Sequence, residues 1–228
     1  MKRLIPMIIL VILSLLQFTA CASRNTDINT APSTDQIEYE TTSSGYLLNE
    51  GIPCEVDGWL VYETISYDGE YTSLINEAES LVRKWWNDDK TFHRPDVVWV
   101  KILAGEVRGF QADGYLFLDP DTEDREDLLA TIVHEWLHDL VDEYTLIDEV
   151  GTGRPIMEMV VESITVDILG NVEVPTDNYV YFKNNQKLWL HKKELQAAFR
   201  NQEDFSAYKR IFGKNYMEII IKAEEDLS

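Results

Sequence analysis

The chain has 228 residues, of which 45% are hydrophobic and 27% charged, enough apolar material for one packed domain but not for two. Its 41 acidic and 20 basic side chains give a formal charge of −21, which would repel nucleic-acid backbones and anionic lipid headgroups. The two cysteines are too few for a disulfide framework or a cysteine-rich zinc module. A disordered chain and a nucleic-acid partner are therefore not expected.

The first 21 residues have the layout of a signal peptide, with Lys2 and Arg3 before an apolar run over 4–16 and small residues before Cys21. An apolar run of about 13 residues is too short for a membrane-spanning helix, which takes about 20. The segment resembles the lipobox of bacterial lipoproteins, whose cysteine receives the lipid. This resemblance implies lipidation at Cys21 and an extracytoplasmic location on a bacterial membrane. The alternative is an ordinary secretory signal with an incidental cysteine.

Residues 22–45 are rich in Ser and Thr and contain few large apolar side chains. That composition is typical of a flexible tether, so we expect the folded domain to cover 46–228. Once Cys21 carries lipid, Cys54 has no disulfide partner and is expected to act as a small buried hydrophobe.

Strand patterns dominate the first half of this domain. A β-prone run at 59–65 predicts a strand, and apolar spacings of one, three and four over 74–86 predict a helix. A β-branched run predicts a strand at 97–103, and glycines then punctuate a hairpin region that leads into a strand at 115–118.

Helical patterns follow. Acidic residues before 128–141 favour a helix start, and apolar residues around most of that segment predict a deeply buried helix. A second helix is expected from Pro155 to Gly170. Further helices are expected around 188–199, 205–212 and 216–221. The predicted fold class is α+β, with a small mixed sheet before these two helices and a mainly helical C-terminal part.

Three polar side chains interrupt the buried helix in an H-E-x-x-H pattern, namely His134, Glu135 and His138. Residues four apart share a helix face, so both imidazoles can reach one metal ion. Glu135 lies about 100° around the axis from His134, where it can act on a metal-bound water without ligating the metal. We expect one Zn²⁺ per chain here; the alternative is a pair of core histidines bonded to carbonyls or carboxylates.

A catalytic zinc needs a third protein ligand, and the second helix offers Glu158 and Glu162 one turn apart. This pattern resembles the gluzincin metallopeptidases, the thermolysin-like group, over about 97–169. In that family a glutamate about 19 residues beyond the second histidine ligates zinc, and an acid four residues later orients a ligating histidine. The resemblance implies Glu158 as ligand and Glu162 as the orienting acid, with the reverse assignment as the alternative.

The resemblance also implies a zincin-like fold and hydrolysis of peptide bonds, with Glu135 as general base and a strand beside the cleft that binds an extended substrate. An oxyanion stabiliser is expected from the C-terminal part, where His191, Tyr179 and Tyr181 are the candidates. We expect His93 at the surface. Asp139 and Asp142 either orient an imidazole or are solvated, and we favour solvation.

Two main functions follow from these residues. The first is a membrane-tethered, extracytoplasmic zinc metallopeptidase that acts on a peptide or protein substrate. The second is a catalytically inactive zincin-like lipoprotein that serves as a binding or adaptor module. The intact H-E-x-x-H pattern favours the enzyme, because a binding module has no need of the general base. Zinc-dependent hydrolysis of a non-peptide amide would use the same residues.

Overall fold

The structure is a computed structural model of the chain. It describes residues 54–57, 59–63, 70–103, 108–120, 124–141, 146–147, 151–170 and 176–227. The predicted signal peptide, the lipidation site at Cys21 and the tether over 22–45 lie outside the described residues. Within the described part, every helix is too short or too polar to cross a membrane.

Five strands of the described chain form one mixed sheet with the order β1-β2-β3-β5-β4. Strands β3 and β5 pair in parallel, and the other neighbouring pairs are antiparallel. The strands are β1 (Cys54–Val56), β2 (Trp59–Glu63), β3 (Asp96–Ile102), β4 (Gly109–Ala112) and β5 (Tyr115–Leu118). The mixed sheet agrees with the predicted α+β class, and β4 forms one of its edges.

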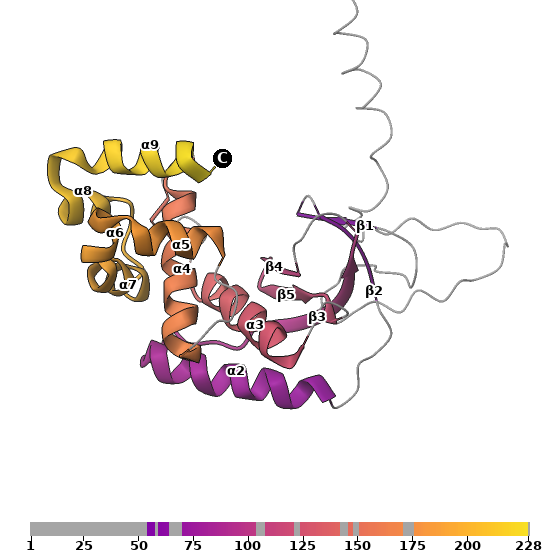
Figure 1. Cartoon of the computed structure of the whole chain (residues 1–228). Helices are drawn as coiled ribbons and strands as arrows, with labels where there is room; N and C mark the ends of the chain where they lie inside the picture. The colour runs from indigo at the N-terminus through magenta and orange to yellow at the C-terminus, as the bar shows by residue number, and fades with distance from the viewer. Residues whose placement is uncertain are drawn as a thin grey trace, which may run out of the picture.

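Helices occupy most of the rest of the described chain. They are α2 (Glu70–Trp86), α3 (Arg125–Asp139), α4 (Arg154–Leu169), α5 (Asp177–Asn184), α6 (Gln186–Leu190), α7 (Lys192–Arg200), α8 (Ser206–Phe212) and α9 (Tyr216–Leu227), with a 3-10 turn, η2, at Gly213–Asn215. Helix α3 packs against β4 and β5 of the sheet and against the helices α2 and α4. Helices α5, α7 and α9 pack on α4, on the side of the molecule away from the sheet (Figure 1).

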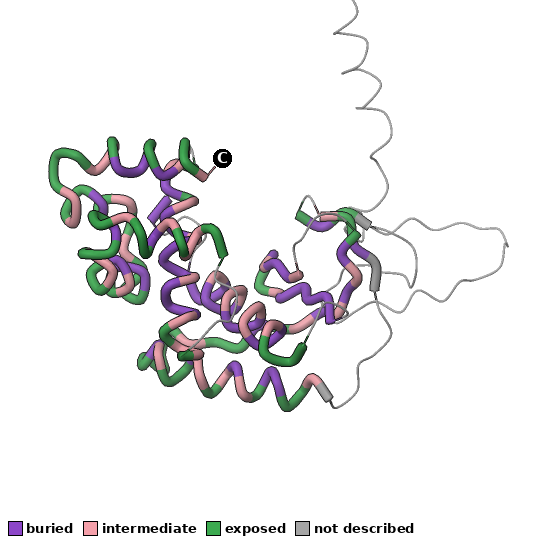
Figure 2. The backbone as a smooth tube through the Cα atoms, viewed as in Figure 1, coloured by how far each residue is buried: buried purple, intermediate pink, exposed green. Residues whose placement is uncertain are grey.

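The larger hydrophobic core lies between these helices and one face of the sheet (Figure 2). Helix α3 supplies Ile132, Val133, Trp136 and Leu137 to it, all fully buried. Burial of each large apolar side chain stabilises the fold by about 1.5–3 kcal/mol, so packing rather than helix propensity holds α3 in place. A smaller core on the sheet includes the stacked rings of Phe110 and Phe117, whose centroids are 4.8 Å apart.

Gly109 begins the edge strand β4, where the strand and α3 approach each other closely. A Cβ atom at Gly109 would lie 2.8 Å from Thr131 Cγ2 on α3 and 2.9 Å from Leu118 Cδ2 on β5. Real Cβ atoms do not approach other atoms so closely, and glycine therefore allows β4 to lie against the helix.

The sequence patterns predicted most elements but not their exact limits. The strands and helices expected at 59–65, 74–86, 97–103, 115–118 and 128–141 correspond to β2, α2, β3, β5 and α3. Helix α4 ends at Gly170 as expected. Gly170 has φ 79°, and its N–H donates to the carbonyl of Val166. The helical region predicted at 188–199 is two helices, separated at His191. Strand β1 and helix α5 were not predicted.

Candidate metal centre

Helix α3 carries the H-E-x-x-H residues, and Asp124 caps its N-terminus. The side chain of Asp124 accepts hydrogen bonds from the backbone N–H groups of Glu126 and Asp127, at 2.9 and 3.1 Å. Such a cap satisfies N–H groups that have no partner within the helix. The acidic side chains of the first turn also interact favourably with the positive N-terminal end of the helix dipole. With the apolar residues of α3 buried in the core, His134 and His138 remain half-buried on one face.

Helix α4 carries the two candidate glutamates. Its residues Met157, Met159, Val160 and Val161 are buried, which fixes the rotation of the helix about its axis. The side chain of Glu158 is 35% exposed and that of Glu162 only 14% exposed. The apolar neighbours thus hold both carboxylates towards α3.

Three side chains meet at one point between α3 and α4. His134 Nε2 is 3.1 Å from His138 Nε2. Glu158 Oε2 is 3.4 Å from the first of these atoms and 3.3 Å from the second. Among the described residues, this is a group whose ligand atoms are close enough to share one metal ion, all lying within 4.8 Å of one another.

Glu162 approaches the other nitrogen of His134. Its Oε1 atom is 3.7 Å from His134 Nδ1, on the opposite edge of the ring from Glu158. The two glutamates, one helical turn apart, therefore have different relations to the same imidazole. This geometry favours Glu158 as the ligand and Glu162 as the group that orients His134.

Burial and charge act against each other in this group. Burial alone would lower the pKa of His134, but the hydrogen bond to Glu158 and the charges of Glu135 and Glu162 raise it to about 9. Burial raises the pKa of Glu135, and the charges of His134 and His138 oppose that shift. The pKa of Glu158 is well below its usual value because the two histidines outweigh its burial. The centre thus holds Glu158 as an anion.

A cavity of about 440 Å³ opens beside these residues, within the range of sites that bind small ligands. It is lined by Asp57, Trp59, Gly109, Phe110, Gln111, His134, Glu135, His138, Ile147, Arg154, Met157 and Glu158. Residues of the edge strand β4 therefore form one wall, and the first turn of α4 contributes to another. No sequence pattern indicates a place for Gln111 in this cavity. Arg154 could have been found, since it precedes Glu158 by four residues on the same helix face.

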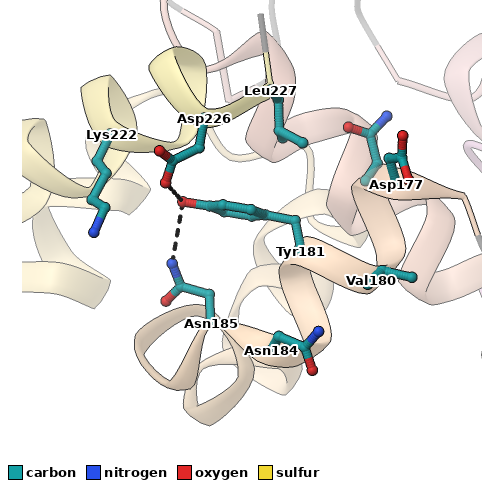
Figure 3. Close-up of a pocket in the computed structure, with 9 residues that line it drawn as sticks. Asp177, Val180, Tyr181, Asn184, Asn185, Lys222, Asp226 and Leu227 are labelled. Carbon is teal, nitrogen blue, oxygen red and sulfur yellow. Dashed lines mark hydrogen bonds between the residues drawn. The ribbon is translucent and has the colours of Figure 1, made fainter.

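The three candidate oxyanion stabilisers lie elsewhere, and none is among the residues that line this cavity. Tyr181 belongs to a separate hollow of about 790 Å³ between α5 and α9, where its hydroxyl donates to Asp226 Oδ2 at 2.9 Å (Figure 3). Its pKa is raised by burial and by that hydrogen bond. Tyr179 contributes its backbone N–H to the Thr176 cap of α5. The structure does not bring these tyrosines to the candidate metal centre.

His191 ends helix α6, and its partners are local. Its Nδ1 atom lies 2.5 Å from Glu194 Oε2, and its ring packs edge-on against Phe212. Both partners of the His191 imidazole therefore belong to the C-terminal helices.

Asp139 is buried, and the expectation that it is solvated was wrong. Its side chain is 2% exposed, and Oδ2 lies 2.7 Å from Nε2 of His93, which is half exposed. Gln111 Nε2 donates to Oδ1 at 3.4 Å. Solvent is displaced because the segment before β3 covers the end of α3, where Trp136 donates to the His93 carbonyl at 3.0 Å. Asp142 lies outside the described residues.

The comparisons with known proteins found no match. No family model matches the chain, and neither a curated protein nor a solved structure matches it.

Proposed function

We propose that the protein is a zinc-dependent metallopeptidase, with one Zn²⁺ held by His134, His138 and Glu158. The observation that carries the proposal is the triangle formed by His134 Nε2, His138 Nε2 and Glu158 Oε2, with sides of 3.1, 3.3 and 3.4 Å. Three atoms bound at about 2.0–2.1 Å to one tetrahedral zinc are about 3.3 Å apart. Two imidazoles and one carboxylate are also a donor set that catalytic zinc uses.

The surroundings of the triangle support the same proposal. Histidines that ligate a metal usually have a hydrogen-bonding or charged partner at their other ring nitrogen, which fixes the orientation of the ring. Glu162 stands in that relation to His134, at 3.7 Å from Nδ1.

The chemistry assigns separate tasks to the residues around the cavity. Zinc bound there would lower the pKa of a coordinated water towards about 7 and polarise a carbonyl group. Glu135 lines the same cavity, about 100° around α3 from His134, and would take the proton of the attacking water and give it to the leaving amine. The edge strand β4 would pair with an extended peptide through its backbone.

The order of elements supports a zincin-like fold, with a sheet, then the helix of the two histidines, then the helix of the glutamate. We extend the proposal to the location of the enzyme, on the resemblance of the first 21 residues to a lipoprotein signal. Cys21 would anchor the protein to a bacterial membrane outside the cytoplasm, where it would meet peptide or protein substrates.

The variant Glu135→Gln tests the catalytic part of the proposal. It should keep one zinc per chain, because Glu135 is not a ligand, and it should reduce peptide cleavage by about 100-fold or more, the contribution of a general base. Glu218→Gln, an exposed change of the same charge on α9, is the control and should cleave normally. Cleavage of a decapeptide library, measured by mass spectrometry, gives the rates. Undiminished cleavage by Glu135→Gln would contradict the proposal.

A further inference from the structure

The described arginines outside the cavity nearly all have an acidic or aromatic partner. Arg83 pairs with Glu79 and Asp89, Arg94 with Glu79, Arg125 with Glu77 and Arg210 with Glu203, while Arg200 lies over the ring of Trp85. Arg154 differs, because no carboxylate of the described chain lies within ion-pair distance of it. In a chain with 41 acidic and 20 basic residues, an arginine without an acidic partner among the described residues is unexpected.

Arg154 is placed where a substrate would lie. It lines the same cavity as Glu135 and the proposed ligand Glu158, and no other arginine or lysine is among the described residues that line it. Four residues of α-helix span about 6 Å along the axis, so the backbone of Arg154 is one turn from that of Glu158 on the same face.

The backbone that carries Arg154 is held firmly by the C-terminal helices. The preceding residue, Gly153, donates its N–H to Glu224 Oε1 at 2.8 Å, and its carbonyl accepts from the Tyr208 hydroxyl at 3.4 Å. Gly153 has φ 98°, and a Cβ there would lie 2.8 Å from the carbonyl oxygen of Leu146. Helices α8 and α9 thus fix the point from which the arginine extends.

The charges of the cavity indicate what Arg154 would bind. Asp57, Glu135 and Glu158 line the same space, and the whole chain is strongly acidic, so an anionic group of a substrate would be repelled without a local cation. A guanidinium group offers paired N–H donors that match the two oxygens of a carboxylate.

We infer that Arg154 binds a carboxylate group of the substrate and so selects peptides by the position of that carboxylate along the peptide. This inference rests on the proposed peptidase function. Because Arg154 and the triangle are parts of one cavity, the cleaved bond should lie at a fixed number of residues from a carboxylate. That carboxylate belongs either to the C-terminus of the peptide or to an Asp or Glu side chain.

The experiment uses the full chain loaded with zinc and a decapeptide library prepared in two forms, with free-acid and with amidated C-termini. Initial rates and cleavage sites are read by mass spectrometry. Arg154→Gln removes the cation, Arg154→Lys keeps the charge without the paired donors, and Lys193→Gln removes an exposed positive charge on α7 as the control. We expect the wild-type chain and Lys193→Gln to prefer suitably placed carboxylates by about tenfold or more. Arg154→Gln should lose that preference, and Arg154→Lys should keep part of it.

The outcomes separate the sources and the failures. Preference for free-acid over amidated peptides identifies the C-terminal carboxylate, whereas equal rates with cleavage sites clustered near Asp and Glu identify side chains. A wild-type chain that cleaves without regard to carboxylates overturns the inference and leaves the peptidase in place. If Arg154→Gln lowers the cleavage rate of all peptides equally, or changes no rate, the inference is also overturned and the peptidase is left in place. No cleavage of any peptide by the zinc-loaded wild type overturns the proposed function, and the inference with it.

Discussion

The different positions of Glu158 and Glu162 predict different losses of zinc affinity when each is replaced by glutamine. Glu158 Oε2 completes the triangle with both histidines, so Glu158→Gln removes an anionic ligand and leaves two imidazoles. Glu162 approaches only His134 Nδ1, at 3.7 Å, and such an orienting group contributes about 10- to 100-fold to metal affinity. We therefore expect Glu162→Gln to weaken zinc binding by that factor, or about 1.4–2.8 kcal/mol, and Glu158→Gln to weaken it further.

The assay is competition for zinc between the full chain and a chromophoric chelator of known affinity. Glu218→Gln serves as the control, because it changes the net charge by the same amount at an exposed site on α9 and should leave the affinity unchanged. Circular dichroism verifies that each variant is folded. A greater loss in Glu162→Gln than in Glu158→Gln would assign the ligand role to Glu162 and refute our reading of the geometry.

Two further predictions concern stability, measured by urea unfolding. Gly170→Ala should lower the free energy of unfolding by about 1–2 kcal/mol, because φ is 79° there, although the added Cβ meets nothing within 4 Å. Gly153→Ala should lower it clearly more, because its Cβ also collides with Leu146 and Tyr208. Equal losses would contradict the tight packing at Gly153. His93→Ala should lower the free energy of unfolding by about 1–3 kcal/mol, because it removes the closest partner of the buried Asp139 carboxylate. The control Arg94→Ala breaks the pair with Glu79 and should lower it by less than about 1 kcal/mol. The opposite order would refute the structural role of the Asp139 contact.

Long apolar patterns made most of the fold predictable. The period of α2 and α3 follows directly from the faces that they bury, and the glycine at 170 marks the end of α4. Helix α5 has only one buried residue, Phe182, so its sequence carries no helical period. Its start is the Thr176 cap, and it packs on α4. Strand β1 has three residues, too few to show alternation.

The candidate centre was predictable where its residues are close in sequence. The spacing of His134 and His138 follows from one turn of helix, and Glu158 was expected from the resemblance to the gluzincin spacing. The contact between His93 and Asp139 joins residues 46 apart, and no local pattern indicates it. The C-terminal aromatic and histidine candidates had no spacing to support them, and their partners in the structure are residues of the C-terminal helices.

The presence of zinc is decided by measuring the zinc content of the full chain, purified without added metal and then titrated with zinc. We predict one tightly bound zinc per chain, with an X-ray absorption spectrum of two imidazole nitrogens and oxygen ligands at about 2.0–2.1 Å. A chain that contains no zinc and takes up none would mean that His134, His138 and Glu158 form a hydrogen-bonded group without a metal, and would contradict the proposed zinc enzyme.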